Sequence, residues 1–211
     1  MIVNRPLDHI VYVVPNLEKA CDRLELLLGI RPVFGGYHQT KGTKNALLNL
    51  GNNCYLELLA IDKGNKKIKA PRWMGVDVCK EARITRWAIK STRLKTDSKW
   101  LQKYDTNMGK IDGGQRKTQD GSLLKWKMIL PLAKPAIEVL PFMVDWGKSS
   151  VHPTNKLEDV CQLVGLKTYH PNPKNIQPTL DALDLGCVIQ QSPVVRLIIS
   201  IDSPRGLVEL T

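Results

Sequence analysis

The sequence predicts an α+β fold built from repeated βαβββ modules, and three observations support this. Leu7–Ile61 has the pattern of a strand, a helix and then two or three further strands. Residues 84–146 repeat this order of elements, which indicates an internal duplication. The ending Leu207–Leu210 is similar to Leu56-Glu57-Leu58, which indicates a third, shortened copy. We therefore expect two curled half-sheets around a cleft, divided into a first module (1–62), a linker (63–83), a second module (84–148) and a βαβββ-like C-terminal module (149–211).

The first module begins with Leu7–Val14, an apolar and β-branched run that predicts a strand. Asn16 is a suitable helix cap, and apolar residues recur at helical spacing after it until Gly29 stops the helix. Asn45–Leu50 and Cys54–Ile61 are two further extended runs, separated by a Gly-Asn-Asn turn.

Strand alternation places His9 and Glu57 on the same side of the predicted sheet. His9 shares its face with Val11 and Val13, whereas the opposite face is apolar and must be covered by the helix. His9 and Glu57 therefore fall on the uncovered, concave face. An imidazole and a carboxylate that converge there form half of a divalent-metal site or an acid–base pair. The same spacing also fits a structural role, in which Glu57 satisfies a semi-buried His9.

The stretch Phe34–Asn45 is rich in glycine, which permits close turns and positive φ angles. Such turns can direct the polar side chains of His38, Thr43 and Asn45 inward. Asn45 should lie on the concave side. From the residues alone, a solvated loop histidine is the simpler interpretation of His38.

The segments LDHIVYVVPNLEKA, GGYHQTKGTKNALLNLG and CYLELLAI resemble a glyoxalase-like domain of the vicinal oxygen chelate superfamily. RWAIKS, RKTQDGSLLKWKMILP and VLPFMVDWG resemble its second half, so the resemblance covers nearly the whole chain. It implies a ligand cavity bordered by His38, a homodimer, and a divalent metal (Mn, Fe, Zn, Co or Ni) held by His9, Glu57 and His38. The superfamily includes lyases, isomerases, dioxygenases and metal-free drug-binding proteins, so the resemblance does not fix the activity.

The second module is expected to begin with a strand over Ile84–Lys90 and a helix over Leu94–Tyr104. Ile111–Thr118 and Ser122–Leu130 should be strands joined by an Asp-Gly hairpin turn, and Ala136–Trp146 closes the module.

This second module departs from the metal-binding members that the family resemblance implies. Those members take two ligands from each module, but here the corresponding positions fall at Arg86 or Trp87 and near Pro141–Phe142. Trp and Phe cannot bind such a metal. A complete four-residue shell is therefore missing, and a metal would need His38, His152 or solvent.

The remaining polar and aromatic residues of the expected cleft are candidates for substrate contacts. Trp87 and Trp146 could form aromatic walls, and Arg116 could meet a carboxylate or phosphate, although a solvated arginine fits equally well. His152 follows the second module and resembles a family signature at this junction. The substrate-binding candidates are Thr43, Asn45, Trp87, Arg116, Trp146 and His152.

The C-terminal region exceeds what two modules need, and we interpret it as a structural or dimerisation module. Gly165 stands where a histidine equivalent to His9 would be, so this region offers no matching ligand pair. The expected elements are helices over 157–163 and 174–183 and extended runs over 166–169, 187–190, 194–201 and 207–210.

Composition excludes several classes of protein. At 211 residues, 43% hydrophobic and 24% charged, the chain has an ordinary globular composition. No apolar run approaches the ~20 residues of a membrane span, and we see no signal-peptide pattern. Five cysteines without CxxC spacing indicate core fillers in a reducing compartment. We therefore expect a cytoplasmic protein without a membrane partner.

The net charge of +11 is concentrated in one region. Residues 63–127 contain 18 of the 31 Lys and Arg residues but 6 of the 20 Asp and Glu residues. These basic runs are short and mixed with Gly and Pro, as in a solvated loop. The pattern favours an anionic small-molecule ligand and makes a nucleic-acid partner the minority interpretation.

The function that we expect is that of a glyoxalase-like small-molecule enzyme, acting on a compact carbonyl or vicinal-oxygen compound. The catalytic candidates are His9 and Glu57, either as an acid–base pair or with a metal. The alternative is a non-catalytic protein of the bleomycin-resistance type, which binds and sequesters a small molecule in the same cleft.

Overall fold

The computed structural model describes residues 4–117, 121, 123–147 and 151–211. In the first module, local hydrogen bonds set both ends of the helix. The Asn16 side chain accepts a hydrogen bond from the Lys19 backbone N–H. Gly29 ends the helix with a left-handed φ of 81° and donates its N–H to the Glu25 carbonyl. The elements are β1 (Leu7–Val13), α1 (Leu17–Leu28), β2 (Val33–His38), β3 (Thr43–Asn49) and β4 (Tyr55–Ile61).

The second module has the same order of elements, although its last strand is shorter than the expected 136–146. Pro135 and Pro141 lack the backbone N–H that a central strand must donate, and regular pairing therefore begins only at Phe142. The elements are β5 (Arg83–Lys90), α2 (Leu94–Tyr104), β6 (Ile111–Lys117), β7 (Leu123–Ile129) and β8 (Phe142–Asp145).

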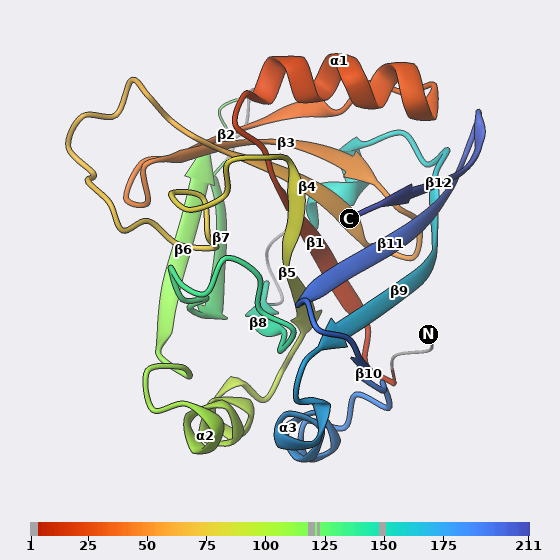
Figure 1. The fold of residues 1–211 in the computed structure, drawn as a ribbon. Coiled ribbons are helices and arrows are strands. Elements are labelled where there is room, and N and C mark those ends of the chain that lie inside the picture. Colours follow the sequence, from red (N-terminus) through yellow and green to blue (C-terminus); the bar gives the residue numbers. More distant parts are fainter. Residues whose placement is uncertain (1–3, 118–120, 122, 148–150) are drawn as a thin grey trace.

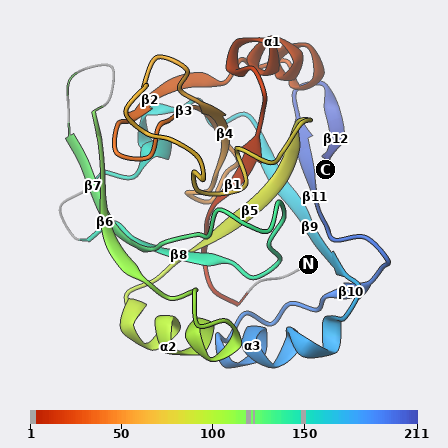
Figure 2. The same cartoon turned by 60° about the vertical axis from the view of Figure 1, so that its left-hand side comes forward.

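The strands of both modules form one sheet in the order β2-β3-β4-β1-β5-β8-β7-β6. β1 is parallel to β4 and β5 is parallel to β8, while the antiparallel pair β1–β5 joins the modules at the centre. Figure 2 shows the sheet curling until its edge strands β2 and β6 meet, with α1 and α2 outside the curl. The predicted α+β class with curled βαβββ modules is confirmed.

The C-terminal region forms a separate sheet on the outer side of the large one, near β5 (Figure 1). Its elements follow the expected βαβββ order, but its strand order is β10-β9-β11-β12. The first strand, β9, therefore lies between two strands of its own region, whereas β1 and β5 each lie at the end of their own module. The predicted helix over 157–163 is wrong, because alternating burial gives a strand from Gln162 onward. The elements are η1 (Pro153–Lys156), β9 (Gln162–His170), η2 (Pro173–Asn175), α3 (Gln177–Ala182), β10 (Gln190–Gln191), β11 (Arg196–Ser203) and β12 (Gly206–Leu210).

Apolar side chains fill both sides of the large sheet. On the outer side, one cluster joins the sheet to both helices and to the second sheet. Inside the curl, a smaller cluster includes Val11, Leu59 and Phe142, and the linker contributes Trp73 and Met74 to it. Much of the space inside the curl is therefore packed. In the part of the chain that the structure describes, no helix is long and apolar enough to cross a membrane.

Candidate functional site

His9 and Glu57 meet inside the curled sheet. They come from the neighbouring parallel strands β1 and β4, and His9 Nε2 lies 3.6 Å from Glu57 Oε2. Each residue is only 5% exposed. The period-two alternation of both strands directs these side chains to the concave face, while Ile10 and Leu56 pack on the outer face.

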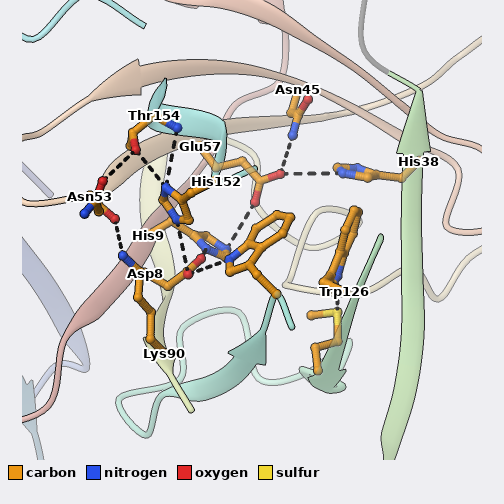
Figure 3. Close-up of polar contacts among 12 residues, drawn as sticks. Asp8, His9, His38, Asn45, Asn53, Glu57, Lys90, Trp126, His152 and Thr154 are labelled. Atoms are coloured by element: carbon orange, nitrogen blue, oxygen red, sulfur yellow. Dashed lines mark hydrogen bonds and ion pairs between the residues drawn. The ribbon is translucent and has the colours of Figure 1, made fainter. Parts of the chain in front are cut away.

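His38 approaches the same carboxylate from the edge strand β2. Its Nε2 lies 3.8 Å from Glu57 Oε1, and its Nδ1 lies 3.1 Å from Thr43 Oγ1. Thr43 Oγ1 also accepts a hydrogen bond from Trp73 Nε1, which fixes the hydroxyl beside the imidazole. His38 is buried in a strand, so the interpretation as a solvated loop histidine is wrong. Figure 3 shows Glu57 between the two imidazoles.

Asn45 holds Glu57 from β3. Its Nδ2 donates a 2.6 Å hydrogen bond to Glu57 Oε1. An ionised carboxylate only accepts hydrogen bonds, so the amide nitrogen must face it. The amide oxygen Oδ1 is buried and has no partner among the residues that the structure describes. A buried acceptor without a donor is costly, and it marks a place for a donor from a ligand or water.

Asp8 belongs to the site although the sequence analysis did not single it out. Its Oδ1 accepts a 2.6 Å hydrogen bond from His9 Nδ1, and its Oδ2 accepts a 2.7 Å bond from Trp146 Nε1. His152 Nε2 lies 3.4 Å from the same Oδ2. Burial raises the pKa of Asp8, but the hydrogen bonds of His152 and His9 outweigh it and hold that pKa well below its usual range.

A β-bulge explains why alternation missed Asp8. Between Leu7 and His9 the first strand advances by two residues while its partner β5 advances by one, from Ile89 to Ala88. The extra residue is Asp8, and a bulge changes the direction of the side chains beside it. The available signal was a carboxylate directly before a histidine in an otherwise apolar strand.

The polar groups surround a small, partly enclosed chamber. Its volume is about 20 Å³, close to what one water molecule requires. Next to it lies an open groove of about 540 Å³ formed by β6, β7 and the end of β8. Trp126 and Trp146 line both spaces, and their ring centroids are 5.2 Å apart. The chamber is lined by His9, His38, Asn45, Tyr55, Glu57, Trp73, Met74, Trp126, Met128, Val144 and Trp146.

The structure brings five of the sequence candidates to the lining of this chamber: His9, His38, Asn45, Glu57 and Trp146. Thr43 and His152 do not line it but contact His38 and Asp8 beside it. Trp87 and Arg116 are not placed at the chamber. Trp87 lies on the outer face of β5, is fully buried there, and donates its Nε1–H to the Val139 carbonyl. It cannot serve as a wall of the cleft, because neighbouring residues of a strand face opposite sides. The backbone of Arg116 belongs to β6, but its side chain lies outside the described part of the chain.

The second module has no equivalent of the His9–Glu57 pair. Arg86 precedes Leu94, the start of α2, by the same spacing that separates His9 from α1. Phe142 pairs with Ala88 in the register in which Glu57 pairs with Val11. Its ring contacts the His9 imidazole edge-on at 5.3 Å. The sequence predicted that the second module lacks metal ligands at these two positions. The structure places the guanidinium of Arg86 and the phenyl ring of Phe142 there.

The His9 and His38 imidazoles and the Glu57 carboxylate fit a metal ion only in part. Both imidazoles use Nδ1 for other contacts and turn Nε2 toward Glu57, as metal-binding histidines do. However, no three or more His, Cys, Asp or Glu side chains within the described ranges are grouped so that they could hold a metal. As these side chains lie, they do not form a metal centre.

Comparison with known proteins agrees with this fold. Residues 7–183 match the sequence model of a protein family described as glyoxalase-like domain. A hypothetical protein from Staphylococcus aureus, known from a crystal structure, has a similar fold with a TM-score of 0.67 at 19% identity, covering 97% of this chain and 98% of that one. The methylmalonyl-CoA epimerase from Mycobacterium tuberculosis is less similar, with a TM-score of 0.43 at 18% identity over 70% of this chain and 94% of its own. No curated protein matches the sequence.

Proposed function

The chain belongs to the glyoxalase-like domain family, and from this premise we propose that it is a small-molecule enzyme that moves a proton on a compact carbonyl or vicinal-oxygen compound. The observation that carries the proposal is the partly enclosed chamber in which the Nε2 atoms of His9 and His38 face the Glu57 carboxylate. Buried imidazole and carboxylate groups at this spacing are suited to general acid–base catalysis.

In this proposal His9 is the base, and its surroundings support that role. Asp8 is ionised and can only accept hydrogen bonds, so Nδ1 of His9 carries a proton and donates it. The Nε2 lone pair then faces the chamber and can remove a proton from a carbon next to a carbonyl. Glu57, held by Asn45, is the second group that accepts or returns a proton.

The chamber also supports a substrate class. As the side chains lie, the chamber holds about one water molecule, so a substrate must displace Trp146 and present a compact reacting end. Asn45 Oδ1, which has no partner among the described residues, favours a hydroxyl beside the carbonyl. Lys125 and Lys127 line the groove on the other side of the two tryptophans, which favours an anionic remainder of the substrate. We therefore propose an α-hydroxy-carbonyl compound, with His152 and Trp146 beside its path.

A metal-assisted form of the enzyme would place Mn, Fe, Zn, Co or Ni on His9, Glu57 and His38, where it would polarise vicinal oxygens. The Nε2 orientation supports it, but the positions of Arg86 and Phe142 supply no further ligand. The geometry gives the metal-free form more support. Metal analysis of protein purified without a His-tag or chelator distinguishes the two forms.

Hydrogen exchange in D₂O tests the proposal and does not require the reaction product to be identified. The protein is incubated with a panel of α-hydroxy-carbonyl and α-keto compounds, and proton NMR follows loss of the C–H signal next to the carbonyl. Glu57→Gln and His9→Asn should each slow this exchange by at least about 100-fold. Glu209→Gln, which changes an exposed carboxylate on β12, is the matched control and should leave it unchanged.

Exchange in no compound of the panel, or full exchange in Glu57→Gln, would contradict the enzymatic proposal. Tight binding of a panel compound without any exchange would instead support the sequestering alternative, which the aromatic groove beside the chamber favours. A homodimer and a cytoplasmic location remain predictions of the same proposal. Sedimentation velocity tests the first of these directly.

A further inference from the structure

Asp8 is the point at which three separate parts of the chain meet. It is fully buried at the start of β1, and its two carboxylate oxygens have different partners. Oδ1 accepts from His9 Nδ1, whereas Oδ2 accepts from Trp146 Nε1 after β8 and lies 3.4 Å from His152 Nε2 before η1. Figure 3 shows Asp8 beneath His9 and His152.

The bond on Oδ1 determines how the His9 ring is used. Neutral imidazole has one N–H, and the nitrogen that carries it is set by the partner of the ring. The 2.6 Å contact with a carboxylate keeps the proton on Nδ1. The stacked Tyr55 ring, 4.7 Å from the imidazole, and the edge of Phe142 prevent the ring from turning away.

The bond on Oδ2 holds a wall of the chamber. Trp146 lines both the partly enclosed chamber and the open groove, so its indole stands between the groove and the His9–Glu57 pair. Its other contacts within the described residues are packing contacts: rings at 5.2 Å (Trp126) and 5.5 Å (His152) between centroids, and the apolar cluster inside the curl. The bond to Asp8 is therefore the directional contact that fixes its position.

We propose that Asp8 is a positioning residue that serves both sides of the site: Oδ1 fixes His9 with Nε2 toward Glu57, and Oδ2 anchors Trp146 as the partition between chamber and groove. The proposal rests on the proposed function only in the use of His9 as the base. A substrate enters when Trp146 releases Oδ2, while the bond of Asp8 to His9 stays intact. Orientation of the base and closure of the chamber are thus set by one carboxylate.

The test measures both roles without using activity. Ring-nitrogen NMR of the protein labelled with ¹⁵N-histidine reports which nitrogen of His9 is protonated, with His9→Asn used to assign the signal. The wild type should show N–H at Nδ1 only. Asp8→Asn should lose this single tautomer, because the amide replaces one of the two acceptor oxygens by an NH₂ donor, which would face the N–H of His9 or of Trp146. Asp202→Asn, an exposed change on β11, should leave the signal unaltered.

Access to the chamber is measured by the rate at which diethylpyrocarbonate modifies His9 and His38, followed by peptide mass spectrometry. Trp146→Phe keeps an aromatic ring but removes the donor to Oδ2. It should raise both rates by at least about threefold, leave the His9 tautomer unchanged, and leave the more exposed His170 as an unaltered internal reference. Asp8→Asn should change both readouts.

An N–H at Nε2 of His9 in the wild type would overturn the first role, and unchanged rates in Trp146→Phe would overturn the second. Both measurements stand even if Asp8→Asn does not fold, because they use the wild type and Trp146→Phe. They also stay separate from the proposed function. A protein with no activity can still show both effects, and an active one can lack them.

Discussion

The two βαβββ modules have the same strand order and register, yet they use the same two positions in opposite ways. In the first module, His9 and Glu57 present polar atoms to a partly enclosed chamber. In the second, Arg86 donates to the backbone carbonyls of the proline-rich segment after β7, and Phe142 packs against the His9 ring. The accepting carbonyls of that segment belong to Leu132, Pro135 and Ala136, and a fourth is that of the neighbouring Thr85 in β5.

This difference shows that duplication supplied a symmetric scaffold without requiring symmetric chemistry. Arg86 is 1% exposed and holds a segment in which prolines prevent regular strand pairing. Burial lowers the pKa of Arg86 to about 10, against the opposing effect of nearby Glu138, and the guanidinium stays charged at neutral pH. One module therefore carries the site, while the other stabilises the fold around it.

The largest expected effect comes from removing the guanidinium. Arg86→Met should lower the free energy of unfolding by at least about 3 kcal/mol, because it leaves several buried carbonyls without donors. Glu57→Gln, the matched change in the first module, keeps an acceptor for Asn45 and should cost less than about 1 kcal/mol. Urea denaturation of both variants measures this, and similar losses would break the contrast between the modules.

A smaller effect is expected at Gly114, on which the Trp126 indole lies. A Cβ there would approach the ring to 2.3 Å, so Gly114→Ala must displace Trp126 from its place in the chamber wall. We expect a loss of about 1–3 kcal/mol and a change in tryptophan fluorescence. Gly113→Ala is the control, because its Cβ meets its nearest neighbour only at 3.9 Å. Equal effects of the two variants would contradict the role of the second module in closing the chamber.

The smallest effect concerns the pH dependence around Arg86. Burial raises the pKa of Glu138 above its ordinary value of 4.5, so ionisation of this carboxyl is harder in the folded state. The wild type therefore loses stability as pH rises from about 4.5 through the raised pKa, whereas Glu138→Gln has no such loss. The variant should gain up to about 1 kcal/mol relative to wild type across this range in thermal unfolding. A gain that shrinks as the pH rises would mean that folding lowers the pKa of Glu138, and it would contradict this prediction.

The sequence predicted the pair His9 and Glu57 because strand alternation is a local property. The same rule failed at Asp8, where a bulge against β5 inserts one residue, and bulges depend on the partner strand. Strand alternation also left Arg86 and Trp87 as alternatives for the position that corresponds to His9. A slip of one residue moves a side chain to the other face, and the structure places Trp87 in the outer core.

By itself, the sequence determined the order of the elements in the two modules, their apolar faces and the absence of a second ligand pair, since periodicity and residue type are read along the chain. Only the tertiary structure decided that the cleft narrows to a chamber of about 20 Å³, closed by the distant Trp73, Trp126 and Trp146. It also decided the strand order of the C-terminal sheet. The physical reason is that long-range packing, which no local pattern encodes, selects the segments that cover each face.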